Sequence, residues 1–123
     1  MELLISMGII VLLMGVGIVS YTETNKKARD AKRKADIESI RSALELYRTV
    51  QGRYPSLTVN ASNCITSTSI TAGAVTYLAT VPTDTKDDGV TYCYKYVLGA
   101  SPFTTYTMTC TFEGGEACSY INP

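Results

Sequence analysis

The pattern of hydrophobic and polar positions divides the first fifty residues into two segments. Residues 3–19 form an apolar run without a charged side chain, and the carboxylate of Glu2 stands at its head. An α-helix from Leu3 to Tyr21 would rise about 28 Å, which is close to the thickness of a bilayer's hydrocarbon core. No small-residue cleavage site stands out after the run, so we expect a retained, membrane-capable helix rather than a removed signal peptide.

The second segment continues the helix with a different pattern. From Lys26 to about Gln51, apolar residues recur mostly at intervals of three and four, which predicts an amphipathic helix. We expect one stripe that starts with small residues and then becomes larger: Ala28, Ala31, Ala35, Ile37, Ile40, Leu44, Tyr47 and Val50. The charged residues, Arg33 among them, would lie off this stripe. Gly52 and the following Arg53-Tyr54-Pro55 predict the end of the helix.

The remaining residues predict a small β-rich head. Residues 56–81 are rich in Thr, Ser, Asn and Ala, which indicates a long loop, with a short helix near residues 72–79. Segments 92–98, 106–112 and 117–121 have strand patterns, and turns at 99–103 and 114–115 would join them into an antiparallel sheet.

The expected fold class is therefore α+β, with one long N-terminal helix packed on about three antiparallel strands. Residues 1–25 would be the hydrophobic membrane or filament-core helix, 26–52 its amphipathic continuation, and 53–123 the globular head. A helix of about fifty residues is about 75 Å long. The head can cover only its second half, so the first half must enter a membrane or contact neighbouring chains.

Charge and composition exclude several classes of function. Eleven basic and eleven acidic residues cancel, so the chain as a whole is not an electrostatic binder of nucleic acid. The sequence has no His, no Ser in a nucleophile-elbow setting and no glycine loop that would cradle phosphate. We therefore expect a protein that is not an enzyme.

The four cysteines all lie in the second half, and none has the C-x-x-C spacing of a zinc site. Disulfides in an oxidising compartment fit better. Strand alternation places Cys93 and Cys110 on opposite faces of the sheet if the tyrosine and methionine faces both meet the helix. Those two cysteines could then not bond, which leaves two of the three connectivities that four cysteines allow. We prefer Cys110–Cys118 across the Gly114-Gly115 turn, with Cys64–Cys93 holding the long loop.

Several motifs together resemble one bacterial family. Glu2-Leu3-Leu4-Ile5 opens an apolar helix, residues 28–37 read ARDAKRKADI, and Gly52-Arg53-Tyr54-Pro55 follows the helix. These motifs, with residues 77–84 and 92–96, are similar to type IV pilins and type II secretion pseudopilins, in particular the secretion-G-like branch. The resemblance implies one long helix followed by an antiparallel sheet, which is also the fold that the patterns predict.

The resemblance also implies partners and a location. Such proteins are made with a basic leader that a prepilin peptidase removes, and they are often N-methylated. They stay in the inner membrane until an assembly machinery extracts them into a helical filament of identical subunits at the cell surface. The family's glutamate near the N-terminus is thought to pair with the amino terminus of a neighbouring subunit, and this role carries over to Glu2. The alternative for Glu2 is an interfacial carboxylate favoured by the helix dipole.

Gly15 and Gly17 are unusual inside a helix, because glycine costs about 1 kcal/mol there relative to alanine. One interpretation is close packing, which membrane helices achieve with glycine. The other is a segment that loses helicity, and we expect residues 15–19 to be non-helical in a filament.

Residues 82–89 contain Asp84, Asp87 and Asp88, a density of hard oxygen ligands that can hold Ca²⁺. The resemblance points the same way, because secretion-type major pseudopilins bind calcium in a comparable loop. Lys86 lies among the carboxylates, and the alternative is a solvated turn in which Asp and Gly provide turn chemistry.

The basic cluster at 26–34 allows direct binding to DNA or anionic lipid, but we favour a solvated helix face paired with acidic residues. The leading functional hypothesis is the structural subunit of a type IV pilus-like filament for adhesion, motility or DNA uptake. The alternatives are a pseudopilin of a type II secretion-like system and a monomeric membrane-anchored extracytoplasmic binding module.

Overall fold

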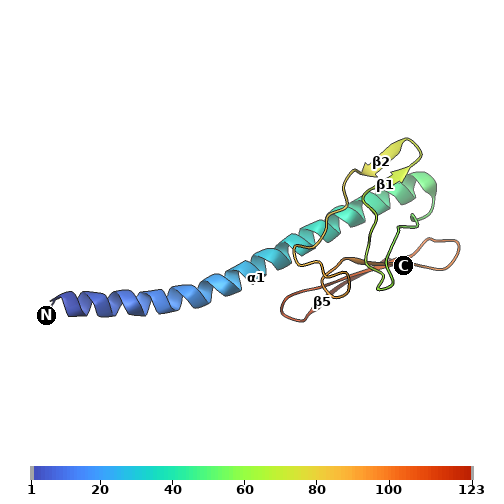
Figure 1. Cartoon of the computed structure of the whole chain (residues 1–123). Helices are drawn as coiled ribbons and strands as arrows, with labels where there is room; N and C mark the ends of the chain where they lie inside the picture. Colours follow the sequence, from blue (N-terminus) through green and yellow to red (C-terminus); the bar gives the residue numbers. More distant parts are fainter. Residues whose placement is uncertain (1, 123) are drawn as a thin grey trace.

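The protein was described from a computed structural model, which covers residues 2–122 and excludes the side chains of residues 16–20. Its elements are α1 (Glu2–Gln51), β1 (Ile70–Ala72), β2 (Val75–Leu78), β3 (Lys95–Leu98), β4 (Tyr106–Thr111) and β5 (Ala117–Asn122). Figure 1 shows a long, gently curved helix that carries the head on its C-terminal half only. The N-terminal half extends beyond the head on its own.

Helix α1 ends where the sequence predicts. Gln51 is its last residue, and Gly52 follows with a φ of 74°. The amide of Gly52 donates to the carbonyl of Arg48 at 2.7 Å, which satisfies one of the last carbonyls of the helix. Glycine suits this position because other residues rarely adopt a positive φ.

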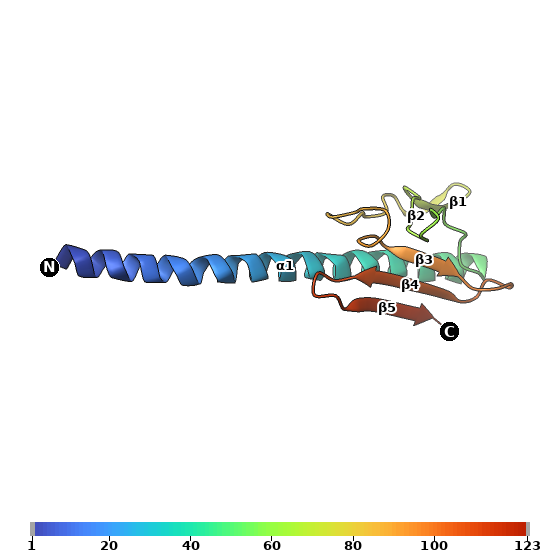
Figure 2. The ribbon, with the colours of Figure 1, turned by 60° about the horizontal axis from the view of Figure 1, so that its bottom comes forward.

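Strands β3, β4 and β5 form an antiparallel sheet in that order. Figure 2 shows the sheet beside the second half of α1, with its strands running along the helix. Tyr96 lies opposite Met108, and Cys110 lies opposite Cys118. Along β4, buried and partly buried residues alternate, as a strand with one face on a core requires. The expected three-stranded sheet is confirmed.

The segment expected to hold a short helix near residues 72–79 forms a hairpin instead. Strands β1 and β2 pair in antiparallel register, and Gly73 at φ 59° lies in the turn between them. The β-branched residues Ile70, Thr71, Val75 and Thr76 favour extended backbone, and a positive φ at the turn suits a tight hairpin. This second, two-stranded sheet contacts α1 through both of its strands.

The core lies between α1 and the three-stranded sheet. Ile37, Ile40 and Leu44 of the helix are fully buried, and Met108 of β4 is buried with them. Tyr94, Tyr96 and Tyr106 complete the same cluster from the sheet side. Two of these hydroxyls donate to polar partners: Tyr94 to Asp36 Oδ2 at 2.7 Å, and Tyr96 to the carbonyl of Pro55 at 2.8 Å. These contacts explain why the head covers the second half of α1.

Among the residues with described side chains, no helical stretch is long and apolar enough to pass through a membrane.

Candidate functional site

A buried arginine joins α1 to the aspartate-rich loop. The Arg33 side chain is 1% exposed, and that of Asp84 is 2% exposed. The guanidinium donates from Nε to Asp84 Oδ2 at 2.5 Å and from Nη2 to Asp84 Oδ1 at 3.0 Å, which makes a two-pronged ion pair. Nη1 donates to Asp30 Oδ1 at 2.6 Å. Residues 51 positions apart in the sequence are thus held together.

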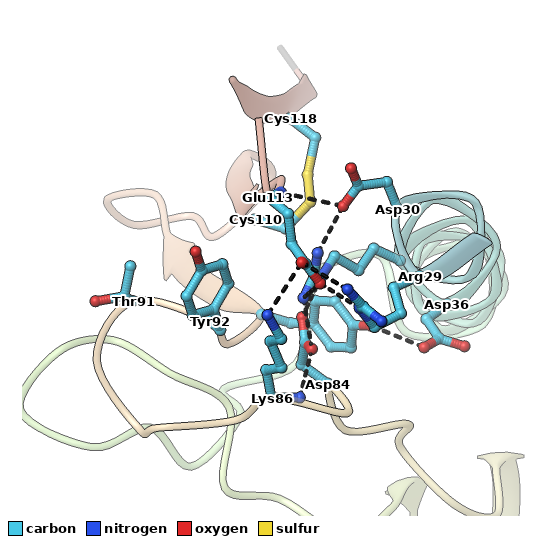
Figure 3. Close-up of polar contacts among 12 residues, drawn as sticks. Arg29, Asp30, Asp36, Asp84, Lys86, Thr91, Tyr92, Cys110, Glu113 and Cys118 are labelled. Carbon is cyan, nitrogen blue, oxygen red and sulfur yellow. Dashed lines mark hydrogen bonds and ion pairs between the residues drawn. A yellow bond between two sulfur atoms is a disulfide. The ribbon is translucent and has the colours of Figure 1, made fainter. Parts of the chain in front are cut away.

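The turn between β4 and β5 enters the same cluster through Glu113. Its carboxylate accepts two hydrogen bonds from the guanidinium of Arg29 and one from Lys86 Nζ at 3.0 Å. Its backbone amide donates to Asp30 at 3.2 Å. Figure 3 shows these side chains converging from the helix, the aspartate-rich loop and the β4–β5 turn. We call Arg29, Asp30, Arg33, Asp84, Lys86 and Glu113 the ion-pair junction.

The junction shifts the acidity of its members. Hydrogen bonds from Arg29, assisted by Lys86, lower the pKa of Glu113 to about 2. Burial alone would raise the pKa of Asp84, but the hydrogen bonds from Arg33 and from the Lys86 amide outweigh it, so this pKa is lowered. The hydrogen bond to Asp84 raises the pKa of Arg33 further above its usual value. The junction thus combines three basic side chains, those of Arg29, Arg33 and Lys86, with three acidic ones, those of Asp30, Asp84 and Glu113.

The two other candidate calcium ligands, Asp87 and Asp88, accept hydrogen bonds from the backbone of the residues that follow them. Asp87 accepts a hydrogen bond from the amide of Gly89 at 2.8 Å. Asp88 Oδ1 accepts from three successive amides, those of residues 90, 91 and 92, at 2.7–3.0 Å. The bond from the Val90 amide is the strongest of several effects that lower the pKa of Asp88 to about 2. Within residues 2–122, no three His, Cys, Asp or Glu side chains are grouped to hold a metal ion.

The residues that were expected to form one stripe on the second half of α1 lie on two different faces of the helix. Ile37, Ile40 and Leu44 point into the core, and Arg33 is buried on their side, one turn before Ile37. Ala28, Ala31, Ala35 and Val50 are exposed instead. The three alanines belong to a face that continues at intervals of three and four along the side away from the core. We call this the outer seam: Ala28, Ala31, Ala35, Ser39, Ser42, Leu46 and Val50.

This stripe was wrong because residues 35 and 37 are two positions apart on a helix, which turns the second away from the first by about 200°. Arg33 was missed for a related reason. A charged residue inside a helix is normally solvated, and its partner at position 84 cannot be recognised from local spacing. The signal available in the sequence was the 3.6-residue period itself, which places Arg33, Ile37, Ile40 and Leu44 on one face.

The first half of α1 presents its apolar side chains to solvent. Every large apolar residue from Leu3 to Met14 is between 52% and 80% exposed. Glu2 is exposed as well, and no ion pair recorded for the described residues includes it. Backbone geometry is helical throughout residues 2–51, including Gly15. Gly17 lies among residues 16–20, outside the residues with described side chains. Loss of helicity in a filament stays a prediction.

Two disulfides tie the head together, Cys64–Cys93 and Cys110–Cys118. This is the connectivity that the sequence analysis preferred. The first closes a separation of 29 residues and connects the long loop to the segment before β3. The second spans the Gly114-Gly115 turn and joins β4 to β5 beside the ion-pair junction (Figure 3).

The basic cluster at 26–34 is largely engaged with the protein itself. Lys26 pairs with Glu23 at 3.0 Å, Arg29 pairs with Glu113, and Arg33 is buried in the junction. Lys34 Nζ lies 5.2 Å from the ring centre of Phe112. Three of these basic residues are thus paired with acidic residues, as the sequence analysis favoured, but Arg33 is buried and not solvated.

An exposed apolar half-helix, a covered second half and a small disulfide-bonded antiparallel head define a pilin-like subunit. The family model for protein G of the type II secretion system matches residues 20–110. The chain therefore belongs to this pseudopilin family, and it is a pseudopilin-type secretion subunit. The matched range includes Arg33 and Asp84 and excludes Glu2. Searches of curated proteins and of solved structures found no match.

Proposed function

We propose that this chain is the filament-forming subunit of a type II secretion-like system and that it polymerises through α1. The observation that carries the proposal is the uncovered apolar surface from Leu3 to Met14, on a helix whose second half is covered by its own head. Contiguous apolar surface of this extent marks a protein or membrane contact. Family membership supports assembly with other subunits, and it favours the secretion pseudopilin over the pilus role that the sequence analysis placed first.

The outer seam supports helix-to-helix contact along the rest of α1. Its side chains are small or uncharged, which allows another helix to approach closely. Leu46 and Val50 are 54% and 61% exposed, so the seam also offers apolar area near the head. In the proposed filament, the apolar halves bundle at the axis while the seam contacts neighbouring helices. Before assembly, the apolar half would hold the subunit in the inner membrane.

Glu2 is proposed to set the axial register of this bundle. A carboxylate at the head of an apolar helix is costly in a nonpolar setting unless it is paired. The partner proposed is the amino terminus of an adjacent subunit, which is the role that the family resemblance implies.

The test is Glu2→Ala in the full chain, with Glu23→Ala as a matched control that removes a carboxylate from the same helix. We expect Glu2→Ala to reduce filament yield strongly in sheared material examined by electron microscopy, while the disulfide-bonded head stays folded by circular dichroism. Glu23→Ala should assemble normally. Normal filaments from Glu2→Ala would contradict the role of Glu2.

A separate experiment distinguishes a filament subunit from a monomeric anchored module. Residues 2–25 are replaced by an unrelated membrane helix, and secretion and filaments are both measured. A filament subunit should lose both. A chain that keeps its function after this replacement is an anchored module, and the proposal would then be wrong.

A further inference from the structure

The ion-pair junction is arranged like a cation-binding site, but the cation in it is a side chain, the Arg33 guanidinium. Three carboxylates, those of Asp30, Asp84 and Glu113, surround the Arg33 guanidinium, and they come from α1, the aspartate-rich loop and the β4–β5 turn. The Arg33 guanidinium lies 2.6 Å from Asp30, 2.5 Å from Asp84 and 3.7 Å from Glu113. A single buried positive charge thus connects three segments that are far apart in the sequence.

The oxygen atoms of these carboxylates are already used by nitrogen donors. Asp84 accepts at both oxygens from Arg33, and its Oδ1 also accepts from the amide of Lys86 at 2.9 Å. Glu113 accepts at both oxygens from Arg29, and its Oε2 also accepts from Lys86 Nζ. A calcium ion takes six to eight oxygen ligands. To enter here, it would have to displace a guanidinium that both oxygens of Asp84 hold.

The aspartates that follow Asp84 do not supply a second set of ligands. Asp88 closes the turn after Gly89 by accepting from three amides, and Asp87 accepts from Gly89 itself. The loop is therefore closed by its own backbone donors. These contacts leave the loop anchored at one end by Asp84 and folded at the other by Asp88.

We infer that the Arg33 guanidinium takes the place of a bound calcium ion in this chain, so that the head folds and docks on α1 independently of calcium. The inference goes beyond the proposed filament role, because it concerns how the head is held and not how subunits assemble. It assigns Arg33 as a positioning residue that fixes the aspartate-rich loop and the β4–β5 turn against the helix.

The first test uses the full-length wild-type chain in detergent micelles. Thermal unfolding is followed by near-ultraviolet circular dichroism in excess calcium chloride and in excess calcium chelator, and calcium chloride is titrated calorimetrically. We expect the same Tm in both solutions and no saturable binding heat. A Tm that rises with calcium, or a saturable binding heat, would overturn the inference.

The second test uses Arg33→Met, with Arg41→Met as the matched control on the same helix. Arg41 is 44% exposed and pairs with Glu38 at 3.3 Å, so removing it leaves no buried charge. Removing Arg33 strands buried carboxylates, and we expect Tm to fall by more than about 10 °C with and without calcium. A Tm unchanged from wild type, or one lowered only in chelator, contradicts the assignment.

Two milder substitutions test the inference even if Arg33→Met does not fold. Arg33→Lys keeps the charge but loses the two-pronged geometry, and Asp84→Asn keeps the shape but loses the carboxylate charge. Both should lower Tm by a smaller amount, and by the same amount in calcium and in chelator. A calcium-dependent loss in either variant would refute the inference.

Discussion

The two halves of α1 belong to one uninterrupted helix and differ in what covers them. From Leu3 to Met14 every large apolar side chain is more than half exposed, whereas Ile37, Ile40 and Leu44 have no exposed surface. Helix propensity does not account for the contrast, since both halves are helical. The second half is held by contacts within the chain, and the first half has apolar surface left for contacts outside it. Stability within the chain therefore resides in the head region, whereas the first half and the outer seam are the surfaces that the proposed filament would use.

Reducing the disulfides should produce the largest difference between the two halves of the chain in how much structure they keep. In the chain-entropy model, a bridge over 29 residues stabilises by about 3.6 kcal/mol and one over 8 residues by about 2.5 kcal/mol. Together they equal a large fraction of the total stability of a small domain. In detergent micelles, we expect a reductant to abolish the near-ultraviolet tyrosine signal of the head while the first half of α1 keeps its far-ultraviolet helical signal.

The two bridges can also be removed singly. Replacing Cys64 and Cys93 by serine should cost about 1 kcal/mol more than replacing Cys110 and Cys118, because the larger loop gains more freedom when it is opened. Retention of the near-ultraviolet signal after full reduction would show that packing alone holds the head.

Two leucines separated by one residue test the same contrast inside the second half. Leu44 is fully buried and Leu46 is 54% exposed on the outer seam. Leu44→Ala should lower the free energy of unfolding by about 2–5 kcal/mol, because it leaves a cavity in the core. Leu46→Ala should lower it by less than about 1 kcal/mol, as exposed sites away from special features do. Urea unfolding of the full chain in micelles, followed by tyrosine fluorescence, measures both.

Filament yield tests Leu46 in the opposite sense, because its substitution should impair assembly without impairing stability. Leu46→Ala removes apolar area from the outer seam, so we expect fewer filaments from a head of normal stability. Equal losses of stability from the two substitutions would mean that the covered and uncovered faces are assigned wrongly.

The sequence was sufficient for the parts of this comparison that depend on local pattern. The helix end at Gly52, the alternation of β4 and the pairing of Cys110 with Cys118 all follow from spacing within a few residues. The β1–β2 hairpin was missed because its strands are short and separated by one turn, so neither has enough alternation to identify it. The junction was missed because it depends on position 33 meeting positions 84 and 113, and no local rule predicts that contact.

The burial of Arg33 also shows why hydrophobic patterning fails at this site. The stripe was built from apolar residues alone, so a buried guanidinium at the correct helical angle was assigned to solvent. Without Arg33 to mark the core face before Ile37, the three alanines were assigned to the same face as the core residues.

Acid should lower the stability of the head by a smaller amount than reduction does, and the loss should increase gradually as the pH falls. Asp84, Asp88 and Glu113 all have lowered pKa values in the folded protein, the last two of about 2, so the folded head binds fewer protons than the unfolded chain in mildly acidic solution. Their contribution to stability is complete above the ordinary carboxyl pKa of about 4 and is lost as pH falls toward 2. We therefore expect Tm to be constant near neutral pH and to decrease progressively below about pH 4.5.

Glu113→Gln distinguishes the junction from general acid effects. Without the Glu113 carboxylate the decrease of Tm between about pH 4.5 and pH 2 should be shallower, since one linked proton is removed. Glu116→Gln, on the exposed side of the same turn, is the matched control and should keep the wild-type slope. If both variants gave the same slope as wild type, the acid sensitivity would belong to charges elsewhere, and the junction would not be what holds the head on the second half of α1.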